Sequence, residues 1–291
     1  MTPQNYQFLT TLLARECGLV LDKEKTYLAE SRLAPVARQY GHATIDELIS
    51  NAMATRSREV VRSIVEAMVT HETFFFRDRK PFDHFRDVTL PALMSARQSV
   101  KRLKIWSAAA STGQEAYSLA MIIDQQLRGA TDWQISILGT DISEQALERA
   151  RSGNYSQFEV QRGLPVKQLI EYFEKSGDRW KVKQKLRGRV KFERFNLLES
   201  PSRLGRFDTV FCRNVLIYFD SDVRRRILSG IAQQLETDGA LYLGGAETTI
   251  GLSDAFAPDK EHRGVYRLSP RAAAGGAAPT VGQRAAAAAA R

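Results

Sequence analysis

The sequence predicts an α/β protein in which an all-α N-terminal domain precedes a doubly wound parallel sheet. Two observations predict this class. Apolar residues recur at helical spacing up to about residue 70, and strand-like runs alternate with helical runs from about residue 103 onward. Such alternation is typical of parallel strands joined by right-handed crossover helices. A break in the alternation at about 154–189 indicates a small inserted subdomain.

The size and composition are those of an ordinary globular protein, since the 291 residues are 43% hydrophobic and 26% charged. No stretch approaches the roughly 18 consecutive apolar residues of a membrane span, and the N-terminus lacks the layout of a signal peptide. We therefore expect a cytoplasmic protein without membrane insertion. The net charge of +9 favours an acidic partner, which leaves nucleic acid, an anionic membrane surface and a carboxylate-rich protein open.

The cysteines and histidines are scattered along the chain without the spacing of metal ligands. We therefore expect neither a disulfide nor a zinc site. These residues are Cys17, Cys212, His42, His71, His84 and His262.

Four short helices are expected in the N-terminal domain, residues 1–70, because apolar residues recur there at helical spacing. Thr44 and Glu47 have the spacing of a capping box at the start of the third helix. Helices of this length are marginal alone and must pack together. Their arginines form either a solvated face or a docking surface for an acidic protein. The expected helices cover 8–17, 24–40, 44–49 and 60–68.

Residues 71–94 form the expected linker segment. Three consecutive phenylalanines at 74–76 cannot all face one core from regular structure. We therefore expect this segment to bridge two packing surfaces, with Arg77 at their edge. The alternative is a hydrophobic plug whose arginine only pairs with Asp78 or Asp83.

The sheet domain is expected over 95–269. Its strands should cover 103–108, 135–140, 190–195, 209–213 and 240–244, with an edge strand at 265–268. Its helices, and the helix before it, should cover 82–94, 115–127, 144–151 and 222–235. In the insertion, a helix at 166–173 precedes a basic, hairpin-like run at 178–185. Residues 270–291 are rich in alanine and glycine, and we expect a disordered tail.

Polar side chains follow the expected strands at the edge where parallel strands end. Ligands of open parallel sheets bind at that edge. Glu115 comes just after the turn that follows the first strand, and Asp141 ends the second. An acidic residue at the second position can accept hydrogen bonds from both hydroxyls of a ribose. Further candidates at strand ends are Asn196, Leu197, Arg213, Asn214 and Tyr218.

The turn at 110–113 argues against a dinucleotide. It contains one glycine, Gly113, instead of a G-x-G-x-x-G run, and Glu115 at the helix start would repel a pyrophosphate. The sequence also lacks a G-x-x-x-x-G-K-[ST] phosphate loop. A cofactor with a ribose and a cationic group fits better, and S-adenosylmethionine has both.

Each candidate also has a purely structural interpretation. Asp141 could neighbour the N-cap of the next helix, and Asn196 could be a turn residue. Arg213 and Asn214 could cap a strand, and Tyr218 could be a core aromatic residue. Each signal is weak alone, but their common position at strand ends favours a site.

Five motifs together resemble the chemotaxis receptor methyltransferases, the CheR family, over residues 1 to about 269. The resemblance implies a Rossmann-like S-adenosylmethionine domain with a small inserted β-subdomain, behind an all-α N-terminal domain. It also implies methyl esterification of glutamate side chains on the cytoplasmic helices of chemoreceptors, for sensory adaptation, with S-adenosyl-L-homocysteine as the product. The motifs are TFFFR at 73–77, WSAAASTGQEAYS at 106–118, GTDI at 139–142, NL at 196–197 and FCRNVLIYFD at 211–220.

The resemblance assigns the cofactor pocket to matching positions. Glu115 would hold the methionine ammonium group and Asp141 the ribose. Asn196 and Leu197 would border the adenine. The pocket would be completed by Thr73, Arg77, Arg213 and Asn214.

Arg77 and Tyr218 would be the catalytic residues, facing the methyl group and the substrate carboxylate. His71 stands where many members have asparagine, so it receives no role. The compact loop at 174–180 resembles the type of member that does not tether to a receptor's C-terminal pentapeptide.

The implied chemistry needs few protein groups, because a glutamate with a pKa of about 4.3 is already an anion at neutral pH. Neither a general base nor a metal is then required. One rival is a nucleic-acid methyltransferase, which the basic charge suits, but the sequence shows no aromatic stacking platform. The other is a noncatalytic adaptor that responds to S-adenosylmethionine. We expect a monomer that binds receptor cytoplasmic domains and no nucleic acid.

Overall fold

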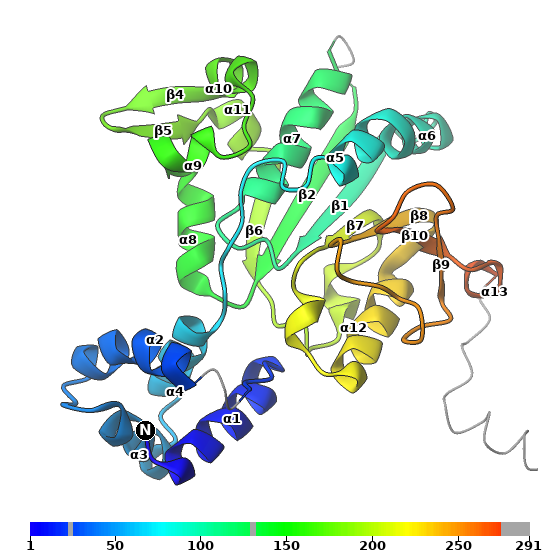
Figure 1. The fold of residues 1–291 in the computed structure, drawn as a ribbon. Coiled ribbons are helices and arrows are strands. Elements are labelled where there is room, and N and C mark those ends of the chain that lie inside the picture. The colour runs from blue at the N-terminus through cyan, green and yellow to red at the C-terminus, as the bar shows by residue number, and fades with distance from the viewer. Residues whose placement is uncertain (23–25, 129–131, 275–291) are drawn as a thin grey trace, which may run out of the picture.

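The computed structural model describes residues 1–22, 26–128 and 132–274. Figure 1 shows the helices of the N-terminal part grouped at one end of a twisted sheet. The described helices include none that combines the length and the apolar character of a membrane span.

The N-terminal part contains the four expected helices. They are α1 Pro3–Cys17, α2 Thr26–Gln39, α3 Ile45–Thr55 and α4 Arg58–Met68. The start of the second expected helix, residues 24–25, lies outside the described residues. Helix α1 ends at Gly18 in the left-handed conformation. The expected capping box of α3 forms only in part, because the Glu47 carboxylate accepts the N–H of Ala43 rather than that of Thr44.

These four helices pack around a core of their own. Leu9, Leu13, Leu33 and Ile64 are fully buried in it, and burial of each such side chain stabilises the fold by about 1.5–3 kcal/mol. Ile142, from the sheet domain, packs against this core. The contact joins the two parts beside the edge where the strands end.

Two of the three linker phenylalanines, Phe75 and Phe76, are buried in one and the same core, where they contact different partners. Phe75 packs against Tyr155 of the insertion with ring centroids 5.1 Å apart, and Phe76 packs against Phe82 of the following helix at 5.5 Å. Phe74 is only partly buried. The proposed pairing of Arg77 with Asp78 or Asp83 is wrong, because its Nη1 donates to a backbone carbonyl, that of Glu72, at 2.6 Å.

The helix expected at 82–94 is longer and irregular. It consists of α5 Lys80–His84, the π-helical turn η2 Phe85–Thr89 and α6 Leu90–Ala96. Phe82, Phe85 and Leu90 bury their side chains in the same core as the first strand of the sheet.

The central sheet has seven strands in the order β6-β2-β1-β7-β8-β10-β9. Five of them run parallel, and β10 is antiparallel to both β8 and β9. The chain leaves β1 toward β2 on one side and returns to β7 on the other, so the topological switch lies between β1 and β7. The strands are β1 Arg102–Ala108, β2 Gln134–Asp141, β6 Val190–Arg194, β7 Phe207–Cys212, β8 Leu235–Leu243, β9 Phe256–Pro258 and β10 Val265–Leu268.

One sheet prediction is wrong. The strand at 265–268 was expected at the edge, but it lies between β8 and β9, and β9 forms the edge. The short β9 was missed because three residues, with Pro258 at the end, give too little alternation to be recognised.

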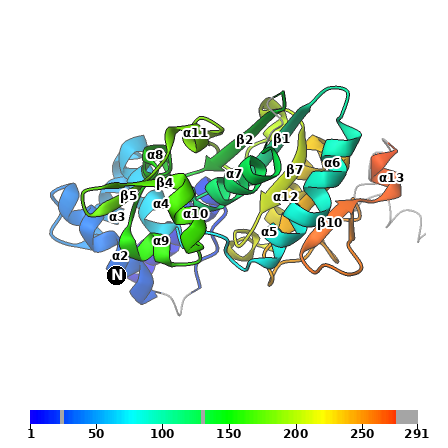
Figure 2. The ribbon, with the colours of Figure 1, turned by 90° about the horizontal axis from the view of Figure 1, so that it is seen from above.

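Helices cover both faces of the sheet. On one face, α7 Gln114–Gln126 packs together with α5 and α6, and Figure 2 shows these three helices along one side of the strands. On the other face, α12 Ser221–Gln234 packs against a second cluster that contains Trp106 and Val210. Alternate strand residues therefore supply the two cores, since Ile105 and Phe211 belong to the first cluster.

The insertion forms a separate three-stranded antiparallel sheet in the order β3-β5-β4. The hairpin was expected at 178–185, but it begins earlier, with β4 at Phe173–Ser176. Gly177, at a φ of +62°, allows the chain to turn directly after this strand. The elements are β3 Asn154–Ser156, α9 Gln157–Gln161, α10 Val166–Tyr172, β4 Phe173–Ser176, β5 Arg179–Val182 and α11 Gln184–Arg187. Helix α8 Glu144–Ser152 leads into it.

The described part of the chain also contains the short elements η3 Pro201–Leu204, η4 Leu216–Tyr218 and α13 Pro270–Ala273. A disordered tail was expected from residue 270, but residues 270–273 form the short helix α13, which is capped by Ser269. Residues 275–291 of that tail lie outside the described residues.

Candidate functional site

A cavity of about 910 Å³, counting its open mouth, lies at the carboxyl ends of the parallel strands. The N-terminal helices, the linker and the sheet domain all contribute to its wall. The cavity brings together every candidate site residue from the sequence, namely Thr73, Arg77, Glu115, Asp141, Asn196, Leu197, Arg213, Asn214 and Tyr218.

Glu115 is a buried carboxylate in the first turn of α7, and it is paired with a cation. Its Oε2 lies 2.9 Å from Nη1 of Arg213, and Ser107 donates to its Oε1 at 2.8 Å. Arg213 also donates to Asp78 of the linker, at 2.7 Å. The ion pair between Arg213 and Asp78 therefore joins the sheet domain to the linker at the cavity wall.

Asp141 is the second buried carboxylate of the cavity. It accepts the backbone N–H of Ser111 at 2.8 Å and that of Ser143 at 3.0 Å. Burial raises the pKa of Asp141, and these N–H donors act in the opposite direction. Asp141 does neighbour the N-cap of α8, Ser143, as the structural interpretation stated. It also holds the turn after β1 in place through the N–H of Ser111.

Asn196 ties the two parts of the chain together. Its Nδ2 donates to the carbonyl of Glu16 in α1 at 2.7 Å, and its Oδ1 accepts the N–H of Leu198 at 3.1 Å. The side-chain amide is therefore engaged in shaping the wall. Leu197 lines the same wall of the cavity.

Non-glycine residues with positive φ cluster around the cavity. Ala109, Ser111 and Asn214 have φ between +52° and +58°. Such conformations cost free energy and persist only where surrounding contacts impose them. The turns after β1 and β7 are thus held in shapes that a free chain would avoid.

Glu247 holds one of these strained turns and was missed in the sequence. Its carboxylate is buried and accepts backbone N–H groups of Asn214 at 2.8 Å, Val215 at 2.8 Å, Leu216 at 2.7 Å and Gly244 at 2.6 Å. Glu247 follows β8, the last parallel strand. A search for polar residues at the end of that strand, as was made for the other strands, would also have found it.

Arg77 and Tyr218 line the cavity from opposite parts of the chain, the linker and η4, and both are partly exposed. The Arg77 guanidinium lies 5.7 Å from the ring centroid of Phe74. The backbone carbonyl of Tyr218 accepts the N–H of Val20 at 3.1 Å. The side-chain hydroxyl of Tyr218 takes no part in that contact. Both residues therefore border the space of the cavity.

The linker and the N-terminal part supply wall residues that sequence reasoning did not predict, because no local pattern shows how the parts dock. Cys17, Leu19 and Val69 line the cavity. So does His71, whose buried Nε2 has no hydrogen-bond partner within the described residues. Ser111 Oγ donates to the His71 carbonyl at 2.9 Å.

The residues present fit S-adenosylmethionine. Two buried carboxylates suit an ammonium group and a ribose, and the unpaired His71 Nε2 offers a further polar contact. Apolar side chains of Ile142, Phe195 and Leu197 can accept an adenine ring. The wall lacks the glycine-rich cradle that phosphates require, since Gly113 is the only glycine of the described turn after β1.

Comparison with known proteins agrees with this geometry. Residues 71–265 match the family described as CheR methyltransferase, SAM binding domain. The chain is 39% identical over 272 residues to a chemotaxis protein methyltransferase of Vibrio parahaemolyticus, covering 92% of this chain and 98% of the relative. It is 41% identical over 258 residues to chemotaxis protein methyltransferase 1 of Pseudomonas aeruginosa, covering 87% of this chain and 93% of the relative.

Proposed function

Because the chain belongs to the CheR family of S-adenosylmethionine-dependent methyltransferases, we propose that it methylates glutamate side chains on the cytoplasmic helices of chemoreceptors. One observation carries the proposal. Two buried carboxylates, Glu115 and Asp141, and a partly exposed arginine, Arg77, line the same cavity. The carboxylates suit a cationic cofactor, and the arginine suits an anionic substrate.

The cofactor-binding residues follow from their charge and position. Glu115 would hold the ammonium group, and Asp141 would accept the ribose hydroxyls. Leu197 and the Asn196 backbone would border the adenine, while Thr73, Arg213 and Asn214 would complete the pocket. When bound, S-adenosylmethionine supplies a methyl group on a sulfonium centre and leaves as S-adenosylhomocysteine.

The protein's task is then to position the substrate. A glutamate side chain is anionic at neutral pH and needs no general base. Arg77 presents a planar fork of donors that matches a carboxylate, so it would aim one substrate oxygen at the methyl group. Tyr218 would border the methyl group from the other wall. Positioning of this kind can lower a barrier by roughly 7–11 kcal/mol in favourable cases.

The charged residues of a groove beside the cofactor cavity support the proposal of an acidic partner. The groove lies between α4 and the sheet domain and shares Ile142 and Asn196 with the cavity. It contains five arginines and four glutamates, but three of the arginines are exposed and form no ion pair within the described residues. These are Arg56, Arg58 and Arg62. We place the acidic face of the receptor helices here, with the protein acting as a monomer in the cytoplasm.

The length of the hairpin in the insertion bears on whether the protein tethers to a receptor. Its hairpin turn is short, and nothing lies within 4 Å of where a Cβ on Gly177 would be. We propose that it does not bind a receptor's C-terminal pentapeptide. A clear binding isotherm with such a peptide would refute this part.

The proposal is tested with cofactor carrying a labelled methyl group. Purified receptor cytoplasmic fragments, RNA, and buffer alone are each incubated with the protein. We expect label only on the receptor fragment, and we expect mild base to release it, as a carboxyl methyl ester requires. Label on RNA would favour a nucleic-acid methyltransferase. Cofactor binding without any transfer would favour a noncatalytic adaptor.

A further inference from the structure

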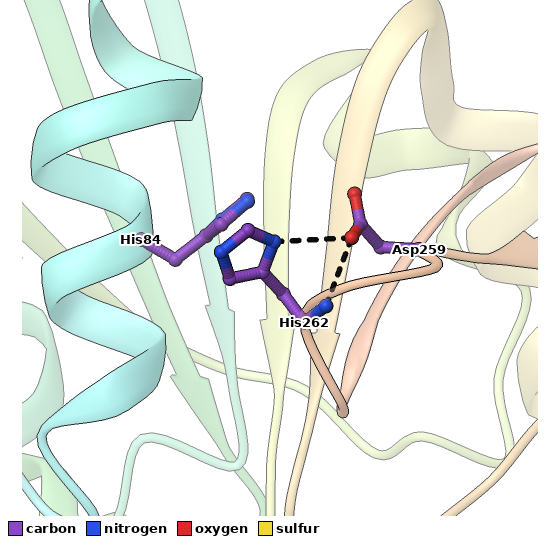
Figure 3. A group of neighbouring side chains, drawn as sticks. All are labelled: His84, Asp259 and His262. Carbon is purple, nitrogen blue, oxygen red and sulfur yellow. Dashed lines mark hydrogen bonds and ion pairs between the residues drawn. The ribbon is translucent and has the colours of Figure 1, made fainter.

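Two histidines and an aspartate, His84, His262 and Asp259, lie side by side although His84 is distant from the other two in sequence (Figure 3). His84 ends α5, and Asp259 and His262 lie in the loop between β9 and β10. One possible ligand atom from each residue lies within 4.8 Å of the other two. The two imidazole centroids are 4.3 Å apart. None of the three residues lines the cofactor cavity.

His84 has a buried nitrogen without a partner. The residue is 5% exposed, and its Nε2 forms no hydrogen bond within the described part of the chain. Buried polar atoms are nearly always paired, because an unpaired one loses its hydration without compensation. The His84 Nε2 therefore indicates a partner that is neither backbone nor side chain.

The other nitrogen of His84 is held in a way that leaves this Nε2 available. Nδ1 lies 2.9 Å from the Tyr242 hydroxyl, which lies 2.7 Å from Oγ1 of Thr89. When Tyr242 donates to Thr89, it accepts the Nδ1–H of His84. Nε2 then carries a lone pair. The π-helical turn η2 brings Thr89 into this network, and such turns occur frequently at functional sites.

His262 and Asp259 present a complementary pair of ligand atoms. Nδ1 of His262 lies 3.1 Å from Oδ1 of Asp259, and the same oxygen accepts the backbone N–H groups of Glu261 and His262. These contacts fix the carboxylate in the loop. They leave Nε2 of His262 and Oδ2 of Asp259 outside the network.

We propose that His84, His262 and Asp259 bind a divalent transition-metal ion, preferentially zinc. Two imidazole nitrogens and one carboxylate oxygen form a ligand set that zinc accepts, with water at the fourth position, whereas calcium and magnesium prefer oxygen ligands. Ligand atoms around tetrahedral zinc lie about 3.3 Å apart. The partly exposed side chains of His262 and Asp259 can rotate to close the remaining gap. Sequence spacing did not predict this site because the fold brings its ligands together.

The site would fasten the loop between β9 and β10 to α5. Metal bound only by the folded chain stabilises it, and at a concentration of 100 times the Kd the unfolding equilibrium shifts about 100-fold. The positive charge of Arg267 opposes a cation here, but its Nη1 is engaged by the carbonyl of Asp238 at 3.2 Å. The inference does not depend on the proposed function, since the site is separate from the cofactor cavity.

The test uses the full chain without a histidine tag, freed of metal by a chelator that is then removed. Zinc chloride is titrated calorimetrically, and cobalt chloride is titrated by absorption, because tetrahedral cobalt has a distinctive visible spectrum. We expect one ion per chain with a Kd in the micromolar range or tighter. His262→Ala, in a partly exposed loop, should weaken binding about 30-fold or more, and His42→Ala should leave it unchanged.

Tyr242→Phe tests the role of the buried hydroxyl, and we expect about 10-fold weaker binding from the loss of the partner that orients His84. Zinc should also raise the unfolding temperature of the original chain by several degrees and leave that of His262→Ala unmoved. Absence of binding in the original chain would overturn the proposal. Equal affinity in the His262→Ala variant would overturn it as well.

Discussion

Oε2 of Glu115 lies 2.9 Å from Nη1 of Arg213, and both side chains are buried at the wall of the cavity. Arg213 reaches this position from the end of β7, while Glu115 comes from the first turn of α7. The pair therefore joins the two sides of the topological switch. The Glu115 carboxylate at this point can receive the positive end of a ligand.

Glu115→Gln removes the charge and keeps the shape. We expect affinity for S-adenosylmethionine to fall about 10- to 100-fold, because hydrogen bonds between charged groups are worth about 1.5–3 kcal/mol. Calorimetric titration measures the change. Glu148→Gln, an exposed change on α8, is the matched control and should bind normally. Unaltered affinity in Glu115→Gln would contradict the assigned role.

Arg77→Ala should lower kcat about 100-fold or more, because a misplaced substrate loses the benefit of orientation. Cofactor affinity should change less than about threefold. Arg162→Ala is a close control. The Arg162 guanidinium lies 4.4 Å from the same Phe74 ring and pairs with Glu72, but Arg162 itself does not line the cavity. If both variants lose activity equally, Arg77 acts through packing instead of substrate contact.

Glu247→Gln should destabilise the turn after β7. Its carboxylate accepts several backbone N–H groups, and an amide at the same place would turn an N–H donor toward some of them. We expect the free energy of unfolding to fall by about 2–4 kcal/mol. Urea denaturation measures this change, and cofactor affinity should fall with it because Asn214 lines the cavity. A variant as stable as the original chain would refute the anchoring role.

Gly163→Ala should destabilise the contact between the insertion and the linker. A Cβ at this position would lie 2.1 Å from the carbonyl oxygen of Phe75, and the φ of Gly163 is +88°. We expect a loss of about 3 kcal/mol or more in the free energy of unfolding. Gly177→Ala has a similar φ with nothing within 4 Å, so it should cost only about 1–2 kcal/mol. Equal losses in the two variants would show that crowding at Phe75 is unimportant.

Replacing Arg58 and Arg62 together by glutamate should weaken receptor binding and leave cofactor affinity unchanged. Both arginines are exposed in the groove beside the cavity. Opposite charges across an interface mainly raise the association rate, and salt screens them. We expect KM for the receptor fragment to rise, and its dependence on salt to diminish. Arg226→Glu on α12, outside this groove, is the control, and the same rise in KM there would indicate a nonspecific charge effect.

The strand-end rule predicted much of the site from the sequence. Glu115, Asp141, Asn196 and Arg213 line one cavity, because the ends of parallel strands meet at one edge of the sheet. The same rule was not carried to the last parallel strand, and Glu247 was missed. The rule could also not predict the contribution of α1, since Cys17 reaches the cavity only through the packing of two separate cores.

Other features depend on long-range packing. The outermost strand, β9, is too short to give a pattern, and its pairing with β10 decides which strand lies at the edge. The meeting of His84 with His262 is similar, because the two residues belong to elements that have no local relation in sequence. Local patterns predict where elements form, but the side-chain contacts between distant elements follow from the packed fold.

The most direct test of the central claim is tandem mass spectrometry of a receptor cytoplasmic fragment after incubation with the protein and S-adenosylmethionine. The account predicts that single methyl groups appear on glutamate side chains, that mild base removes them, and that Arg77→Ala greatly reduces their number. Methyl groups on lysine or arginine would contradict the account. An unmodified fragment would also contradict it, if the same protein sample binds S-adenosylmethionine.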